Sequence, residues 1–218
     1  WMVQNYKGFL DNVEIGYFEF QFGLSFPREI CPLVFKNLIV QTFLLPNLKD
    51  TFLSRNIPRF SRLDGVYFNN SSSSSEPTTI NTQMNTVYYN NVYNIRLGRS
   101  LLNENIFGAA QSIVILGHLK LIERDVFRSL VNLTKLELNI YYLREFVHGS
   151  FNEWLGEISE KESCNLKIIQ SSVVRYSYPN EDLCLFKHFD PRMGLKISIW
   201  DGKRDENLTK TCLLLFLI

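Results

Sequence analysis

The residues of this 218-residue chain that are best placed for covalent chemistry are Cys184 and His188. Residues four positions apart share one face of a helix, where an imidazole can activate a thiol as a nucleophile. The Leu-Phe-Lys between them contains no loop glycine, and a working pair also needs an orienting group and donors for an oxyanion. A structural cysteine beside a surface histidine is therefore the preferred interpretation, and we predict that the chain is not an enzyme.

A zinc site is the second chemistry to consider. Cys164, Cys184, His188 and Cys212 supply enough ligands, but they include no close C-x2-C pair of the kind that makes a zinc site persuasive. The sequence also contains no G-x-S-x-G, H-E-x-x-H, P-loop or G-x-G-x-x-G motif. We therefore predict no metal and no cofactor.

The elements that would position these residues are clearest between Leu133 and Leu155, where apolar residues follow neither a helical nor a strand period. Leu133, Leu136 and Leu138 form an L-x-x-L-x-L pattern, which is typical of the strand of one leucine-rich-repeat turn. Phe127 and Phe151 indicate a period of about 24 residues. We expect one continuous core that buries the following residues: Leu136, Leu138, Leu143, Phe146, Phe151 and Trp154.

Similar but weaker patterns occur along the chain. A capping box, in which Ser150 and Glu153 would exchange bonds with each other's amides, predicts a short helix over 151–159. Strands are predicted over 13–20, 38–45, 94–97, 113–115, 166–168 and 195–199. The predicted fold class is α/β, a leucine-rich-repeat solenoid with a curved parallel sheet, about six irregular turns, and short helices on the convex side.

The chain divides into three predicted parts. Residues 1–60 form an N-terminal cap and degenerate repeats, 61–163 form the repeats, and 164–218 form the last repeats and a C-terminal cap. The segment 69–86 contains five consecutive serines and is predicted to be an inserted surface loop.

Net charge, hydrophobicity and sequons restrict the classes of function that the chain can have. The net charge of +1, with basic residues scattered among acids, gives no support to nucleic-acid binding. No segment is long and apolar enough to cross a bilayer. The chain opens with Trp1 instead of Met and contains no signal-peptide pattern, so we interpret it as an excerpt of a longer protein. Asn69, Asn70 and Asn207 begin sequons and are predicted glycosylation sites. Asn132 also begins a sequon, but we expect its side chain to cap backbone groups internally and to remain unmodified.

The repeat pattern of Leu133–Trp154 resembles that of extracellular leucine-rich-repeat proteins. It departs from them at Tyr141, which replaces the ladder asparagine, so no asparagine ladder is expected here. The segments 178–189 and 211–218 resemble the cysteine-bearing C-terminal cap of divergent cell-surface receptors. That resemblance implies a disulfide between Cys184 and Cys212, with no partner assigned to Cys31 or Cys164.

In such a solenoid the residues that alternate with the core residues point to the concave face of the sheet. These predicted binding residues are Arg96, Val114, Leu116, Lys135, Glu137, Asn139, Lys167 and Ile169. A mixed apolar and basic face suits a protein or peptide ligand. We therefore expect the ectodomain of an extracellular or cell-surface receptor, attached to a membrane only through segments outside this chain. The alternatives are an intracellular repeat adaptor and, third, a Cys–His enzyme.

Overall fold

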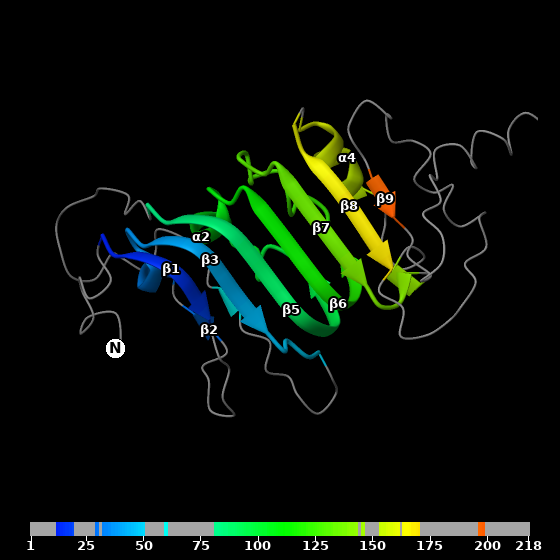
Figure 1. Ribbon diagram of the computed structural model, residues 1–218, viewed down its shortest axis with the longest axis horizontal. Coiled ribbons are helices and arrows are strands. Elements are labelled where there is room, and N and C mark those ends of the chain that lie inside the picture. The colour runs from blue at the N-terminus through cyan, green and yellow to red at the C-terminus, as the bar shows by residue number, and fades with distance from the viewer. Residues whose placement is uncertain are drawn as a thin grey trace, which may run out of the picture.

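The computed structural model describes residues 12–19, 29–30, 32–50, 59–60, 81–143, 145–146, 153–161, 163–170 and 196–198. Their main feature is a seven-stranded sheet in which every pair of neighbouring strands is parallel and the strand order follows the chain order (Figure 1). The strands are β1 (Glu14–Glu19), β3 (Ile39–Pro46), β5 (Gln83–Leu97), β6 (Ser112–Ile122), β7 (Lys135–Ile140), β8 (Asn165–Gln170) and β9 (Lys196–Ser198). The predicted α/β class with a parallel sheet is thus confirmed, in an arrangement compatible with a solenoid.

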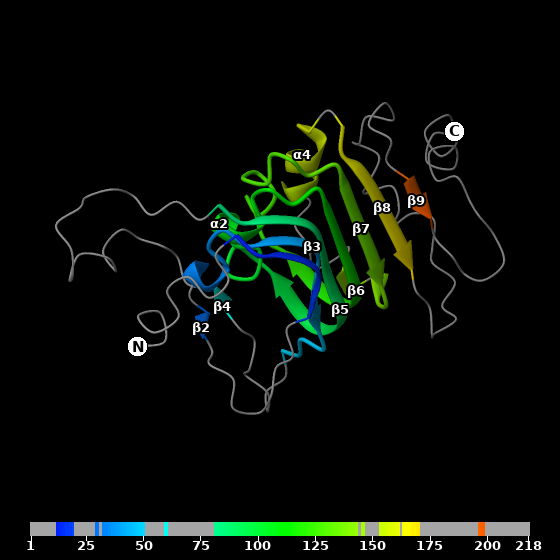
Figure 2. The same ribbon diagram turned by 60° about the vertical axis from the view of Figure 1, so that its left-hand side comes forward.

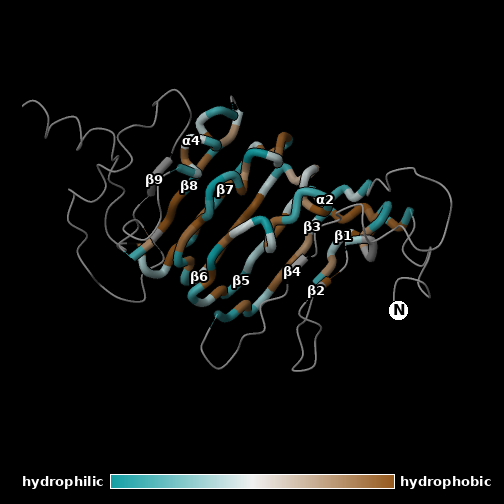
Figure 3. Tube along the Cα trace, turned by 180° about the vertical axis from the view of Figure 1, so that it is seen from behind, coloured by the Kyte–Doolittle hydropathy of each residue, from teal (hydrophilic) through white to brown (hydrophobic). Residues whose placement is uncertain are grey.

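The other described elements are short. Strands β2 (Glu29–Ile30) and β4 (Arg59–Phe60) pair in parallel as a separate sheet. The helical elements are η1 (Pro32–Phe35), α2 (Glu104–Phe107) and α4 (Glu153–Ser159). Figure 2 shows α2 and α4 beside the sheet, and Figure 3 shows the connections between β5, β6 and β7 crossing the side opposite to that seen in Figure 1.

Two rows of buried side chains cross the sheet, one residue per strand, and form its core. The first row, matched by strand register, is Phe43, Val87, Ile113, Leu136 and Leu166. The second row is Leu45, Tyr89, Ile115, Leu138 and Ile168. Because each of β3, β5, β6, β7 and β8 supplies one residue to each row, the cores of these strands stack into one continuous layer.

Strands β5 and β6 bend midway and continue as a parallel pair on the far side of the bend. Register shifts mark the bend on β5, where Asn91 and Asn94 have φ values of 54° and 57°, and on β6 Gly117 has φ +135°. A side chain at Gly117 would place its Cβ 2.2 Å from the carbonyl oxygen of Val92. Only glycine fits this close approach between the two strands.

An asparagine pair bonds two turns at the start of this bend. Asn91 Nδ2 donates to Asn47 Oδ1 at 2.6 Å, and both residues have a positive φ, which asparagine tolerates better than most residues. The expectation of no asparagine ladder came from the turn of Tyr141. In the turns of β3 and β5 the asparagines stand one position earlier in the pattern, so this pair lies outside the turn for which no ladder is expected.

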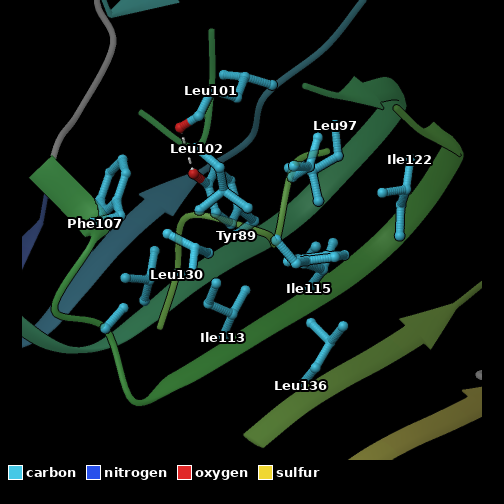
Figure 4. Close-up of a cluster of buried hydrophobic side chains, with 14 of the residues drawn as sticks. Tyr89, Leu97, Leu101, Leu102, Phe107, Ile113, Ile115, Ile122, Leu130 and Leu136 are labelled. Carbon is cyan, nitrogen blue, oxygen red and sulfur yellow. Dashed lines mark hydrogen bonds between the residues drawn. The ribbon is translucent and has the colours of Figure 1, made fainter. Parts of the chain in front are cut away.

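The space behind the sheet is filled by side chains from the connecting turns. Figure 4 shows Leu102, Phe107 and Leu130 packed over the core rows, and the hydroxyl of buried Tyr89 donates to the carbonyl oxygen of Leu101 at 2.7 Å. The bond gives the one polar atom of Tyr89 a partner, which a buried hydroxyl requires.

The expectations for Leu133–Leu155 are confirmed where the structure describes them. Leu136, Leu138, Leu143, Phe146 and Trp154 are all buried, and the Trp154 ring lies 6.0 Å from that of Phe127 and 6.1 Å from that of Phe146. Helix α4 ends at Ser159, as predicted. Ser150, Phe151 and Asn152 lie outside the described residues.

Two boundaries differ from the sequence prediction. The loop predicted over 69–86 ends earlier, because β5 begins at Gln83 and Met84 is fully buried. The strand predicted over 94–97 does not begin a turn of its own, because it is the far half of β5, after the bend. The sheet itself runs without a break across the predicted domain boundaries 60/61 and 163/164.

Candidate binding face

One side of the sheet carries the outward side chains of six strands, and no described helix or strand lies in front of it in Figure 1. We call this side the open face. It comprises the residues of β1, β3, β7 and β8, and of β5 and β6 before their bend, that alternate with the core. Its central row, matched by register, is Glu19, Leu44, Tyr88, Val114, Glu137 and Lys167.

The structure brings most of the predicted binding residues together on this face. Register aligns Val114 with Glu137 and Lys167, and it aligns Leu116 with Asn139 and Ile169 in the next row. Lys135 lies one row in the other direction, between Ser112 and Asn165. These residues form a contiguous patch because neighbouring parallel strands lie about 4.8 Å apart.

Two of the predicted residues do not contribute as expected. Arg96 is exposed, but it follows the bend in β5 and pairs with Leu121, so it stands outside the rows of the open face. Val114 does occupy the central row but is only 8% exposed. Its contribution to a binding surface is therefore small.

Glu137 is the centre of a polar network on β7 and β8. Its carboxylate lies 3.2 Å from Lys135 Nζ and 4.0 Å from Lys167 Nζ, and it accepts a 3.2 Å hydrogen bond from Asn139. Burial raises the pKa of Glu137, but the bonds from Asn139 and Lys135 and the charges of both lysines outweigh it, so the pKa is lowered from 4.5. Glu137 is thus held ionised between the two lysines.

The lysines remain available to a ligand. Their side chains are 48% and 40% exposed, whereas that of Glu137 is 16% exposed. Two positive charges and one negative charge leave this end of the face with one positive charge in excess. Surface ion pairs of this kind are weak and can be exchanged for a ligand carboxylate at little cost.

Sequence reasoning missed two tyrosines on the same face. Tyr88 is 36% exposed in the central row, and Tyr17 on β1 is 57% exposed. A signal for Tyr88 was present, since Met84, Val87 and Tyr89 have the L-x-x-L-x-L spacing and place Tyr88 between two core positions. The five consecutive serines and the polar residues after them outweigh that signal, so the sequence predicts a loop up to residue 86.

A second cluster lies beyond the bend, where the ring of His118 makes edge contacts with Tyr93 and Tyr142. The ring centroids are 5.5 Å and 4.8 Å from that of His118, and His118 Nε2 lies 3.3 Å from Glu145 Oε2. The tyrosines are 49% and 40% exposed. Packing between successive turns accounts for this arrangement, since each ring comes from the next turn along the chain.

Most of the residues considered for catalysis, zinc binding or a disulfide lie outside the described residues. They are Cys31, Cys184, His188 and Cys212. Cys164 is described as a buried free thiol whose pKa is raised by burial to about 11. Within the described ranges no group of three His, Cys, Asp or Glu residues could hold a metal ion, and no described helix is long and apolar enough to cross a membrane.

Only one of the sequon asparagines lies within the described residues. Asn69, Asn70 and Asn207 lie outside the described residues. Asn132 is described, and it is exposed in the turn before β7, beside Val131, which is 75% exposed. The exposure of Asn132 does not support the expected internal capping role, which was the reason for predicting that this sequon remains unmodified.

The described residues form an α/β fold with an all-parallel sheet, and no described helix or strand lies in front of its open face. Comparison with protein-family models, with curated proteins and with solved structures finds no match to this chain. Its function is therefore inferred from the geometry of the open face.

Proposed function

We propose that this chain is a leucine-rich-repeat module that binds a protein or peptide ligand on its open face. The observation that carries the proposal is a patch of adjacent rows on β6, β7 and β8. Its charged residues are Lys135, Glu137 and Lys167, and the next row contains the apolar residues Leu116 and Ile169. Charged residues set beside half-buried apolar residues offer both a contact area and a means of choosing partners.

The repeat assignment draws support from one spacing that recurs on four strands. In each case three buried residues follow the L-x-x-L-x-L pattern, and the second and third residues of each set occupy matching register. The four sets are Val40, Phe43 and Leu45; Met84, Val87 and Tyr89; Ala110, Ile113 and Ile115; and Leu133, Leu136 and Leu138. Solenoids built from such turns generally serve as binding surfaces.

We propose an extracellular or cell-surface setting, as part of a membrane receptor, with glycans at Asn69, Asn70 and Asn207 and a disulfide between Cys184 and Cys212. An intracellular adaptor is the second candidate, and it is favoured by Cys164, a buried thiol of the kind that reduced proteins tolerate. Mass mapping of peptides from the protein, alkylated without prior reduction in the cells that make it, separates the two. A Cys184–Cys212 peptide pair supports the receptor, whereas free thiols at both positions favour the adaptor.

The binding proposal is tested with a random 12-residue peptide library displayed on phage and selected on the immobilised chain. Enriched peptides are synthesised, and their dissociation constants are measured by calorimetry against two variants. The first combines Tyr88→Ala with Lys167→Ala on the open face, and the second combines Tyr93→Ala with Arg96→Ala beyond the bend, so each variant removes one tyrosine and one cation.

We expect the open-face variant to weaken binding by about tenfold or more and the control variant to leave it within about twofold. Circular dichroism melts identify any variant that fails to fold. Peptides that bind both variants and the wild type equally, or a selection that enriches none, would overturn the proposal.

A further inference from the structure

We propose that Asn132 carries an N-linked glycan, attached at the edge of the sheet where β7 begins. This inference rests on the proposed extracellular setting and adds a modification site to those proposed at Asn69, Asn70 and Asn207. It reverses the expectation drawn from the sequence, in which an internal capping role kept Asn132 unmodified. Three features carry it: the acceptor triplet, the free side chain, and the shape of the turn before β7.

Asn132 begins the only N-x-S/T triplet that lies within the described residues. The same four residues occur twice in the chain, because 132–135 and 207–210 both read Asn-Leu-Thr-Lys. A transferase that recognises the acceptor amide and the hydroxyl two residues later therefore meets the same local sequence at both positions. What remains to be decided for Asn132 is whether the folded chain has room for the glycan.

The Asn132 side chain is exposed, and among the described residues none forms a hydrogen bond with it. Other described asparagines are engaged. The Asn91 amide donates to Asn47, and the Asn94 amide donates to the carbonyl oxygen of Asp50 at 2.9 Å. A sugar on either of those amides would compete with a bond between turns, whereas a sugar on Asn132 displaces no bond.

The turn that contains Asn132 is held by bonds that a glycan does not touch. The amide of Leu133 donates to the carbonyl oxygen of Leu130 at 3.1 Å, and Lys161 Nζ donates to the same oxygen at 2.9 Å. Leu130 and Leu133 are both buried, whereas Val131 between them is 75% exposed. The chain therefore turns outward at residues 131–132, between two core residues, and a bulky group on Asn132 extends away from the described core.

The covalent step uses an oligosaccharide carried on a polyprenyl diphosphate and a membrane-bound oligosaccharyltransferase. The new bond joins Asn132 Nδ2 to the anomeric carbon of the first sugar, and the bond from that carbon to the diphosphate oxygen breaks. The polyprenyl diphosphate leaves with the electron pair of the broken bond, and Nδ2 loses one proton. No group is oxidised or reduced.

The structure also indicates when the transfer takes place. In the folded chain Leu133 is 2% exposed, and Thr134 Oγ1 donates to the carbonyl oxygen of Gln111 at 3.1 Å. The middle residue and the hydroxyl of the triplet are thus already engaged once this turn has formed. Transfer therefore precedes the closing of the turn, and the glycan stays outside afterwards because the Asn132 side chain is exposed.

The glycan lies beside the proposed binding face, not on it. Asn132 precedes β7, whose first open-face residue is Lys135, and the central row of that face passes through Glu137. The acceptor therefore stands outside the rows of the open face, at the end of the sheet where the strands begin.

The test expresses the full chain behind a cleavable secretion signal in cultured mammalian cells. Protein from medium and lysate is treated with peptide N-glycosidase in heavy-oxygen water, which leaves an isotope label at each formerly glycosylated position, and is digested with trypsin. Asn132 then lies in the peptide 129–135 (SLVNLTK) and Asn207 in the peptide 205–210 (DENLTK), so two matched peptides report the two sites. The variants are Asn132→Gln, Thr134→Ala and Thr134→Ser.

We expect the label at position 132 in most wild-type molecules. Thr134→Ser should keep the label, because a hydroxyl remains, whereas Asn132→Gln and Thr134→Ala should each remove one glycan from the intact protein. Asn132→Gln should melt within about 2 °C of the deglycosylated wild type, since it changes an exposed side chain without a described partner.

The matched peptides separate this inference from the proposed function. A label at position 207 together with an unlabelled 129–135 peptide would refute the glycan at Asn132 and leave the extracellular setting standing. A label at position 132 that persists in Thr134→Ala would indicate deamidation and would refute it as well. Absence of label from every sequon of the chain would count against both proposals.

Discussion

The carboxylate of Glu157 lies buried against the backbone of Phe127, and its Oε2 accepts the Phe127 amide at 2.8 Å. Its other oxygen accepts the amide of Asp125. Four residues further on, Lys161 Nζ donates to the carbonyl oxygen of Leu130 at 2.9 Å. Side chains of α4 and of the residue Lys161 after it thereby bond to backbone groups of the preceding turn. These bonds give the polar backbone groups of an irregular coil the partners that burial requires.

We predict that Glu157→Ala destabilises the chain by about 2–4 kcal/mol, because it leaves two amides without an acceptor. Glu157→Gln should cost about half as much, since one acceptor oxygen remains. Urea unfolding measures both. Glu153→Gln, on the same helix with a side chain that is 56% exposed, serves as the control and should change stability by less than about 0.5 kcal/mol. Equal losses at positions 153 and 157 would contradict a role for the buried carboxylate.

Two glycines should respond to alanine in opposite directions. Gly117→Ala should cost more than about 2 kcal/mol, because φ is +135° and the new Cβ would lie 2.2 Å from the Val92 carbonyl oxygen. Gly156→Ala should stabilise by about 0.5–1 kcal/mol, since Gly156 is exposed within α4 and a Cβ added there would meet no atom of another described element within 4 Å. Melting temperatures of the two variants test the pair, and a stable Gly117→Ala chain would exclude the close approach at the bend.

Glu137 should make stability depend on acid pH. Its folded pKa is below the ordinary 4.5, so the unfolded chain takes up a proton first as the pH falls. The stabilisation from this group is therefore complete above about pH 5 and is lost as the pH falls through 4.5 toward the folded pKa. The free energy of unfolding, measured in urea from about pH 3 to 7, should fall less steeply below pH 4.5 in Glu137→Gln than in the wild type. Parallel curves would show that the network around Glu137 contributes nothing.

The Cys164 thiol should resist modification in the folded chain. Burial raises its pKa to about 11, so almost no thiolate forms at pH 8, and little of the sulfur is accessible. Iodoacetamide at that pH should label Cys164 only after unfolding in urea, as read by peptide mass mapping. Labelling at the same rate in both states would contradict the burial of this thiol at the start of β8.

Much of the fold could be predicted where local pattern and burial agree. Leu136, Leu138 and Trp154 stand at spacings that only a short strand followed by a coil can bury together, and their burial is confirmed. β5 was divided wrongly because Thr86, Tyr88 and Asn90 alternate with core residues yet have the composition of a loop. Their place as strand residues depends on pairing with β3 and β6, which are distant in sequence.

For the candidate site, alternation along one strand predicted which residues of β7 and β8 point outward. Alternation could not predict that Arg96 lies outside the open face, since the bend at Asn91 changes the direction in which the later residues of β5 point. Nor could it predict that Glu157 is buried, because the burial of this charged residue depends on the amides of Asp125 and Phe127 in an earlier turn.

The sequence by itself determined the class of element and the core residues between Leu133 and Trp154, because the spacing of apolar side chains along a few residues is set by local backbone geometry. The tertiary structure decided the register that places Glu19, Tyr88 and Lys167 in one row. It also decided the bend at Asn91 and Gly117 and the covering of Val114. These depend on contacts between residues of different turns, and the free energy of such contacts is fixed only when the strands lie side by side.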